Sequence, residues 1–333
     1  MRLLVLGGTH HVGRALVEAG LERGHQVVTL NRGVSGVASP GVEARYADRL
    51  DAEAVARALG DDTFDAVVDT WSHAPLAVRH SARLLSGRAG YYGYVSSRSV
   101  YRWPPAPGSD ESAPVVDGDP ASTDAADYAA AKRGGELAVA QEFDGPHSFL
   151  RAGLILGPYE NVGRLPFWLT RVASGGRVPV PGPPERSLQL LDARDLATWL
   201  VDRRPVGTFN TVSRPGHTTM GEVLEECVRV TGADAELVWL PPEVVEASGV
   251  EPWTELPIWT PPTGELAPLH DCDVSAAHAA GLRCRPASQT VADTWAWLQR
   301  EGPPDPATTR AGTGMDAEAE ARLWQAAGLD GRP

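Results

Sequence analysis

A tyrosine and a lysine stand four residues apart in the segment DYAAAKRGGE, as Tyr128 and Lys132. On a helix this spacing places the two side chains on one face. A neighbouring ammonium stabilises the phenolate form of a tyrosine, which would let Tyr128 act as general acid and base on a carbonyl or an alcohol. Such pairs also occur on solvated helix faces, so the spacing alone is a weak signal for catalysis.

A serine pair in the upstream segment YVSSRSVY strengthens this interpretation. Ser97 lies at the end of a predicted strand, where its hydroxyl would hydrogen-bond the same substrate oxygen as Tyr128. Lys132 would in addition hold the ribose of a nicotinamide cofactor. Arg98 and Ser99 follow Ser97, and they would either contact the substrate or form the turn.

The segment GGTHHVG, from Gly7 to Gly13, would bind such a cofactor. It lies between a predicted strand and a predicted helix, and in this context glycines allow a tight turn and close packing of the helix. The free N–H groups and the dipole at the start of the helix would bind a pyrophosphate. A turn without a ligand is the alternative interpretation.

His10 occupies the position where a dinucleotide-binding loop usually has its middle glycine. Its side chain must therefore point away from the phosphates or lie beside them. His10 and His11 are poor metal ligands, because adjacent side chains diverge and no third ligand follows at a useful spacing. The sequence has three widely spaced cysteines, Cys227, Cys272 and Cys284, and no two of them form a CxxC motif. We expect neither a metal site nor a disulfide framework.

The residues after the second predicted strand indicate which dinucleotide would bind. An NAD site usually has an acidic residue here, which accepts from the ribose 2′-hydroxyl. This chain has Asn31 followed by Arg32, and a guanidinium forms charge-assisted hydrogen bonds with a phosphate. NADP(H) is therefore favoured over NAD(H), with a plain surface arginine as the alternative. Asp48, after a further strand, would accept from the adenine amino group or cap the next helix.

The order of the predicted elements gives the fold that would position these groups. Strands are predicted at Arg2–Leu6, Gln26–Leu30, Ala66–Asp69, Tyr91–Ser96, Ser148–Leu156 and Thr208–Val212, and helices at Val12–Leu21, Ala52–Leu59, Pro75–Leu85 and Asp127–Glu142, with Leu188–Leu191 and Asp195–Val201 resuming the alternation. Strands that alternate with helices predict an α/β fold whose parallel sheet is covered on both faces.

The remaining chain breaks this alternation and predicts a second, smaller domain. It is rich in Pro and Gly around the helical stretch Leu165–Ala173, and it contains predicted helices at Met220–Thr231 and Val291–Arg300. We expect residues 1–156 and 188–212 to form a dinucleotide-binding domain, residues 157–187 and 213–300 a substrate-binding domain over the carboxyl edge of the sheet, and residues 301–333 a linker (Gly302–Thr313) and a terminal helix (Met315–Ala327).

Composition limits the class of partner. The chain has 333 residues, 42% of them hydrophobic, and a formal net charge of −13. This charge argues against nucleic acid as the main partner, because phosphate contacts require a basic surface. We expect neither a signal peptide nor a membrane span, because the apolar runs are too short. A cytoplasmic enzyme with a small-molecule substrate is the expectation, with a homodimer left open.

The motifs together resemble a known family. GGTHHVG, YVSSRSVY, the Tyr128–Lys132 pair, LRAGLILGP (Leu150–Pro158) and QLLDARDLA (Gln189–Ala197) resemble the extended and atypical short-chain dehydrogenase/reductase superfamily, of the NAD-dependent epimerase/dehydratase type. The resemblance implies a Rossmann fold with a doubly wound parallel sheet, a smaller C-terminal substrate-binding domain, and Ser97, Tyr128 and Lys132 as the catalytic triad. The residues it implies at the cofactor, together with those suggested above, are Gly7, Thr9, His10, His11, Val12, Gly13, Asn31, Arg32, Asp48, Arg49, Asp69, Thr70 and Lys132.

These observations favour an NAD(P)(H)-dependent oxidoreductase acting on a small carbonyl, alcohol or imine. One alternative is a nucleotide-sugar epimerase or dehydratase with internal hydride return, although VVDTWSH replaces the alanine-rich turn of those enzymes. Another is a non-catalytic member that senses nucleotides or binds RNA. The residues considered for substrate contact are Trp71, His73, Arg98, Ser99, Arg164 and Trp168. Arg164, together with Arg171 and Arg177, would hold a substrate diphosphate, with solvated surface charge as the alternative. Trp168, together with Trp253 and Trp259, would line a site for an apolar or ring-bearing substrate, with core packing as the alternative.

Overall fold

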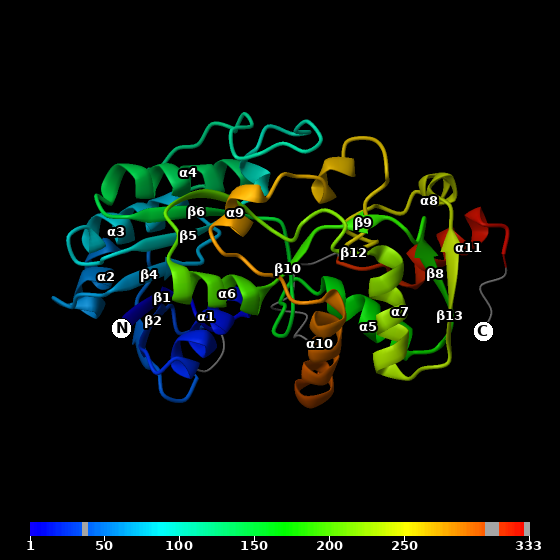
Figure 1. Cartoon of the computed structure of the whole chain (residues 1–333), viewed down its shortest axis with the longest axis horizontal. Helices are drawn as coiled ribbons and strands as arrows, with labels where there is room; N and C mark the ends of the chain where they lie inside the picture. The colour runs from blue at the N-terminus through cyan, green and yellow to red at the C-terminus, as the bar shows by residue number, and fades with distance from the viewer. Residues whose placement is uncertain (35–38, 304–312, 330–333) are drawn as a thin grey trace. The chain divides into compact units, whose positions relative to one another are not determined.

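The computed structural model describes residues 1–34, 39–303 and 313–329 (Figure 1). Most of the predicted linker Gly302–Thr313 lies outside the described residues. Within them, no helix combines the length and apolar character needed to cross a bilayer. In the same part of the chain, no group of three or more His, Cys, Asp or Glu side chains is arranged to hold a metal ion.

A seven-stranded sheet forms the centre of the N-terminal part, in the order β11-β6-β5-β4-β1-β2-β3. Its strands are β1 (Arg2–Leu6), β2 (Gln26–Asn31), β3 (Glu43–Tyr46), β4 (Ala66–Asp69), β5 (Tyr92–Ser97), β6 (His147–Ala152) and β11 (Gly207–Thr211). Every pairing in this sheet is parallel. The order reverses direction at β1, which confirms the predicted doubly wound Rossmann-type sheet.

Helices cover both faces of this sheet, as a parallel sheet requires (Figure 1). They are α1 (His11–Glu22), α2 (Ala52–Leu59), α3 (Pro75–Leu85), the 3₁₀ turn η1 (Arg98–Val100), α4 (Tyr128–Glu142), α6 (Ala193–Arg203) and the short α9 (Ser275–Ala279). Helix α3 packs beside α4, and α1 packs beside α6. The apolar strand residues Leu4, Leu6, Val28 and Val67 are buried in one cluster with residues of α2, α3 and α4.

Local signals in the sequence set where the key helices begin. Asp127 is the N-cap of α4, and its carboxylate accepts from the backbone N–H of Ala130 at 3.0 Å. Asp51 caps α2 in the same way, accepting from Ala54 at 2.9 Å. These caps satisfy helix N–H groups that have no partner within the helix. As a result α4 starts at Tyr128, within one residue of the predicted helix.

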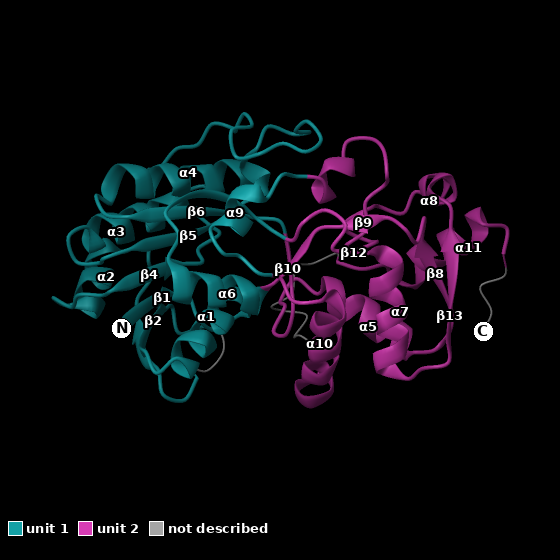
Figure 2. Cartoon of the chain, viewed as in Figure 1, with its two compact units in different colours: residues 1–153, 193–212, 272–283 teal, residues 154–192, 213–271, 284–333 magenta. Residues whose placement is uncertain are grey.

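The chain divides into two compact units (Figure 2). Unit 1 comprises residues 1–153, 193–212 and 272–283, and unit 2 comprises residues 154–192, 213–271 and 284–333. The boundaries differ from those we predicted: residues 154–156 and 188–192 belong to unit 2, the described part of the tail after residue 300 is also counted with unit 2, and residues 272–283 belong to unit 1. The predicted strand Ser148–Leu156 is two strands, because β7 (Leu154–Leu156) leaves the large sheet and pairs with β10 (Leu190–Asp192). Residues 272–283 join unit 1, where α9 packs against β11 and Ala280 accepts from the Trp199 indole.

Unit 2 has its own core and three small two-stranded sheets. The further strands are β8 (Gly176–Pro181), β9 (Ser187–Leu188), β12 (Thr218–Thr219) and β13 (Ala235–Leu240). Its helices are α5 (Arg164–Ala173), α7 (Met220–Thr231), α8 (Pro242–Ser248), the 3₁₀ turn η2 (Ala267–His270), α10 (Ala287–Glu301) and α11 (Ala317–Ala326). The buried tryptophans Trp168 and Trp259 belong to this core, and their indole N–H groups donate to the carbonyls of Pro257 and Gly182.

Candidate active site

The loops after β1 and β4 meet at the carboxyl edge of the sheet. Gly7 has φ +115°, and a Cβ on it would lie 2.3 Å from the hydroxyl oxygen of Thr70. That hydroxyl donates to the carbonyl of Leu6 at 3.0 Å. Because the strand order reverses between β1 and β4, this is the point where open α/β sheets bind their ligands.

The other glycines of the first loop are also required by close approach. A Cβ on Gly13 would lie 2.6 Å from the backbone nitrogen of Gly8, and Gly8 itself has φ +125°. His10 is the N-cap of α1 and has extended backbone, so the helix begins directly after it. Burial lowers the pKa of His10. The tight loop that leads into a helix N-terminus fits the pyrophosphate of a dinucleotide. The remaining predicted loop residues, Thr9, His11 and Val12, lie in this turn and in the first turn of α1.

Arg32 follows β2 directly, and its side chain is exposed. His73, in the loop after β4, is an exposed residue whose ring is partly shielded from solvent, and this partial desolvation, Arg32 and Lys132 lower its pKa. Both cations therefore lie close enough to His73 to affect its charge. Asn31 is the last residue of β2, and its carbonyl accepts from Ala47 at 2.9 Å. The predicted cofactor residue Arg32 and the predicted catalytic residue Lys132 thus border the same loop.

The three predicted catalytic residues lie on neighbouring elements of unit 1. Ser97 is the last residue of β5, and its hydroxyl donates to that of Ser99 at 3.1 Å. Tyr128 is the first residue of α4, and its side chain is 46% exposed. Lys132 Nζ lies 6.0 Å from the centre of the Tyr128 ring. It also donates to the carbonyl of Val95, two residues before Ser97, at 2.7 Å. Lys132 therefore links the helix of Tyr128 to the strand of Ser97.

Lys132 is deeply buried for a cation, at 3% exposed. Its Nζ has a second acceptor, the carbonyl of Trp71 at 2.6 Å. Burial lowers the pKa of Lys132 to about 7, while Asp69 and Glu136 oppose this change. The amine therefore changes protonation near neutral pH, where a proton-transfer site would use it.

Glu136 fastens this helix to the sheet one turn after Lys132. Its carboxylate accepts from the Ser96 hydroxyl at 2.7 Å and from the Arg151 guanidinium at 3.0 Å. Ser96 precedes Ser97, so the same contacts fix the end of β5. Sequence reasoning did not identify Glu136, although its spacing of four residues from Lys132 places it on the same helix face.

Two of the residues predicted at the cofactor bind each other. Arg49 and Asp69 are 2% and 0% exposed, and they form two parallel hydrogen bonds of 2.7 and 2.6 Å. Their side chains are therefore unavailable to a ligand, which corrects that prediction. Asp48 is exposed, and its carboxylate accepts from Leu50 at 2.9 Å. The cap of α2 is Asp51 rather than Asp48, so the capping interpretation of Asp48 is wrong.

Several predicted substrate contacts are also engaged elsewhere. Arg98 and Trp168 are buried, and Trp168 belongs to the core of unit 2. The half-buried Trp71 donates its indole N–H to the carbonyl of Ala74, with its ring edge-on to His73. Arg164 is half-buried, and its guanidinium lies 4.7 Å from the centre of the Trp253 ring, a contact that is compatible with binding a ligand as well. Of the residues predicted for substrate contact, Ser99 and His73 have exposed side chains.

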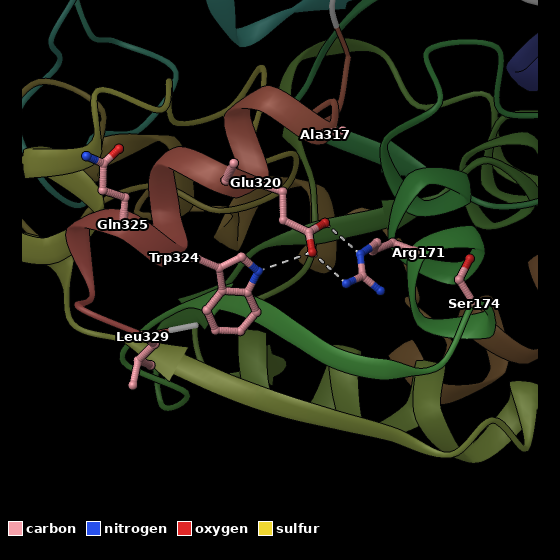
Figure 3. Close-up of a pocket in the computed structure, with 8 residues that line it drawn as sticks. Arg171, Ser174, Ala317, Glu320, Trp324, Gln325 and Leu329 are labelled. Carbon is pink, nitrogen blue, oxygen red and sulfur yellow. Dashed lines mark hydrogen bonds and ion pairs between the residues drawn. The ribbon is translucent and has the colours of Figure 1, made fainter. Parts of the chain in front are cut away.

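A cavity of about 720 Å³ in unit 2 lies between α5 and α11 (Figure 3). Arg171 and Glu320 both line this cavity, and they form two hydrogen bonds of 2.8 and 2.7 Å. The Arg177 guanidinium lies over Trp324, which also lines the cavity. Arg171 of α5 and Arg177 of β8 therefore connect α11 to the rest of unit 2. These contacts replace the diphosphate contact that we considered from the sequence.

The lysine content of the chain is a further signal for this site. Lys132 is the only lysine in the 333 residues, and the other 29 basic side chains, apart from histidines, are arginines. Arginine serves equally well for most surface contacts, whereas a compact amine that changes protonation when buried requires lysine. The single lysine in the sequence therefore marks a site where arginine would not serve.

Comparison with known proteins identifies a matching family. A family model described as the NAD dependent epimerase/dehydratase family matches residues 3–202. A comparison with curated proteins found no significant match.

Several solved structures have a similar fold at low sequence identity. One is the Bordetella bronchiseptica enzyme WbmG in complex with NAD and UDP, at 19% identity, TM-score 0.67, and coverage of 92% of this chain and 97% of that chain. Another is UDP-glucose 4-epimerase from Thermus thermophilus in complex with NAD, at 20% identity, TM-score 0.64, and coverage of 90% and 100%. A third is dTDP-glucose 4,6-dehydratase from Bacillus anthracis in complex with NAD, at 16% identity, TM-score 0.64, and coverage of 90% and 97%.

Proposed function

Because this chain belongs to the NAD dependent epimerase/dehydratase family, we propose that it epimerises or dehydrates a nucleotide-linked sugar with internal return of the hydride. The supporting observation is the buried Lys132, which joins the helix of Tyr128 to the strand of Ser97 beside the glycine loop. Net reduction of a small carbonyl, favoured from the sequence, fits less well, because the matching family is one of epimerases and dehydratases, and two of the three structures described above are a UDP-glucose 4-epimerase and a dTDP-glucose 4,6-dehydratase.

The chain's own groups have distinct roles in this proposal. Tyr128 takes the proton from a substrate hydroxyl as that carbon is oxidised, and it returns the proton when the carbonyl is reduced. Ser97 donates a hydrogen bond to the same oxygen. Lys132, when protonated, stabilises the Tyr128 phenolate. A nicotinamide dinucleotide, when bound, supplies a hydride acceptor and, once reduced, a hydride donor.

We propose that the first loop and the end of β2 hold that dinucleotide. Gly7, Gly8 and Gly13 allow the tight turn and the close packing of the loop, and this turn leads into the N-terminus of α1, where a pyrophosphate would bind. Arg32 is exposed directly after β2, where the adenosine side would lie, and a guanidinium beside Asn31 favours a 2′-phosphate, so we propose a preference for NADP(H). WbmG and the other two structures described above are complexes with NAD. A preference for NADP(H) would therefore distinguish this chain from those three proteins.

Unit 2 is the proposed source of substrate recognition. Arg164 and Trp253 form a cation–aromatic pair within it, and a planar base or a diphosphate would suit such groups. WbmG is a complex with UDP as well as NAD. UDP- and dTDP-linked hexoses are therefore the first compounds to test.

The experiment combines a substrate panel with one variant. Purified protein is incubated with NAD⁺ or NADP⁺ and each nucleotide sugar, and products are identified by mass spectrometry and NMR. We expect an isomerised or dehydrated sugar without net change in the cofactor. Tyr128→Phe should lower turnover roughly 100-fold or more while the dinucleotide still binds. Net oxidation of NADPH by a small carbonyl would overturn the proposal, and binding without any turnover would indicate a non-catalytic member.

A further inference from the structure

Asp69 lies at the end of β4 with all of its acceptor capacity used. Its Oδ1 accepts from Arg49 and from the backbone N–H of Trp71, at 2.7 and 2.9 Å. Its Oδ2 accepts from Arg49 and from the Tyr92 hydroxyl, at 2.6 and 2.7 Å. Arg49 is held in turn by the hydroxyl of Ser81. The carboxylate is thus fixed from the loop after β3, from β5 and from α3.

The Trp71 peptide connects this carboxylate to the active-site amine. Its N–H donates to Asp69, and its carbonyl accepts from Lys132 Nζ at 2.6 Å. The Tyr94 hydroxyl donates to the same carbonyl at 3.3 Å. Gly135 of α4 makes room for that hydroxyl, since a Cβ there would lie 2.3 Å from it. The direction of one peptide group therefore depends on Asp69 at one end and determines an acceptor for Lys132 at the other.

Stability is a weak reason for burying such an ion pair. Removing two charges from water has a large free-energy cost, and apolar residues of similar size often stabilise the fold as well or better. Buried charges are more readily explained where they fix a geometry or a protonation state. Here the pair adjoins a deeply buried lysine that is the only one in the chain.

We propose that Asp69 is a positioning residue for Lys132. Held by Arg49, it directs the Trp71 carbonyl onto Nζ, and its negative charge favours the ammonium over the neutral amine. Only one part of this proposal rests on the proposed function, namely the use of that ammonium in catalysis. The contact itself and the protonation of Lys132 are properties of unit 1 without cofactor or substrate.

The charge of Lys132 depends on groups from every element around it. Burial lowers its pKa, Asp69 and then Glu136 raise it, and Arg49 lowers it by a smaller amount. The titratable or charged groups that face it are Asp69 at the end of β4, Arg49 after β3, His73 after β4, Tyr94 of β5, and Tyr128 and Glu136 of α4. Removal of Asp69 should therefore destabilise the ammonium, and removal of Arg49 should stabilise it.

The single lysine makes this measurement direct. Growth with lysine labelled with ¹³C at Cε gives one labelled side chain in the whole protein. The Cε chemical shift is followed against pH in the full chain without ligands. In the native protein we expect a midpoint near 7, far below that of an ordinary lysine.

Two substitutions distinguish the effect of the Asp69 charge on Lys132 from the effect of looser packing around it. Asp69→Asn keeps an oxygen for the Trp71 N–H and removes the charge, and it should lower the midpoint by about one unit, a tenfold change in the protonation constant. Arg49→Gln should raise the midpoint. Loosening that admits water would raise the midpoint in both variants. An unchanged or raised midpoint in Asp69→Asn would therefore overturn the proposal.

A matched control and a fallback complete the experiment. Asp192→Asn removes a buried aspartate of unit 2, which accepts from Thr290, and it should leave the Lys132 midpoint unchanged. If Asp69→Asn does not fold, the double variant Asp69→Asn/Arg49→Gln leaves no unpaired charge. Because Asp69 has the larger effect, the double variant should still titrate below the native protein, and a higher midpoint would contradict the proposal. Failure of the sugar reaction would not alter any of these titrations.

Discussion

Lys132 Nζ lies 2.6 Å from the carbonyl oxygen of Trp71. The contact ties α4 to the loop after β4, and the second acceptor, Val95, ties it to β5. The amine therefore stands where the helix of Tyr128, the strand of Ser97 and the loop of His73 come together. Changes to the groups that hold this arrangement should alter stability, turnover or cofactor choice in distinguishable ways.

The stability of the protein should depend on pH through Lys132. Its pKa is lowered to about 7 from an ordinary value of 10.5, so between these values the unfolded chain binds more protons. Its contribution to stability therefore rises with pH, by up to about 1.4 kcal/mol per pH unit. We expect the free energy of unfolding of the native protein, relative to Lys132→Met, to increase between about pH 7 and pH 9. Urea denaturation at each pH measures this difference, and a flat or falling difference would contradict the assignment.

Glu160 should give the opposite dependence in unit 2. Burial raises its pKa to about 7, and its carboxyl oxygens accept from the N–H groups of Arg164 and Leu165 at the start of α5. The folded protein therefore binds more protons than the unfolded chain between about pH 4.5 and pH 7. The free energy of unfolding of the native protein, relative to that of Glu160→Gln, should therefore decrease as pH rises through this range. If this difference in the free energy of unfolding increased with pH, the surroundings would stabilise the Glu160 carboxylate, and the prediction would be wrong.

The cap of α4 should matter for turnover as well as stability. Asp127→Ala removes the cap next to Tyr128, and it should cost about 1 kcal/mol of stability. Because Tyr128 lies in the first turn, fraying there should also lower turnover. Asp51→Ala removes the equivalent cap of α2, so it should cost a similar stability while turnover is kept. Equal turnover in the two variants, measured well below their unfolding temperatures, would refute a role for this cap in placing Tyr128.

Arg32 should determine the choice of dinucleotide. A charge-assisted hydrogen bond contributes about 1.5–3 kcal/mol, so NADPH should bind roughly tenfold to a hundredfold more tightly than NADH. Arg32→Ala should remove most of this preference and leave NADH binding nearly unchanged. Arg57→Ala, at an exposed arginine of α2, is the matched control. Calorimetric titration decides the question, and tighter binding of NADH to the native protein would show that Arg32 is only a surface residue.

The periodic elements were predictable because their signals are local. Short, nearly continuous apolar runs located β1, β2 and β4, and Asp127 placed the start of α4 within one residue. The break between β6 and β7 was not predictable, since an uninterrupted apolar run does not reveal that Leu154–Leu156 changes its pairing partner. Strand β8, with prolines at 179 and 181, was read as irregular chain although it pairs with β13.

The candidate site was predictable in its residue types and less so in their contacts. The motifs indicated Tyr128, Lys132 and Ser97, and the structure places all three in unit 1. The Arg49–Asp69 pair was assigned to the cofactor, because charge after a strand looks the same in a sequence whether it faces a ligand or another charge. Burial decides between these readings, and it depends on the sheet order that brings β4 beside β5.

Hydride transfer within one substrate molecule is the central claim, and an isotope measurement tests it most directly. A nucleotide sugar that the protein converts is prepared with deuterium on the carbon that is oxidised, and it is incubated with an unlabelled nicotinamide dinucleotide. The account predicts that the isomerised or dehydrated product keeps the deuterium and that the cofactor shows no net oxidation or reduction. Accumulation of deuterated reduced cofactor, with an oxidised sugar released, would contradict internal return and indicate a net oxidoreductase.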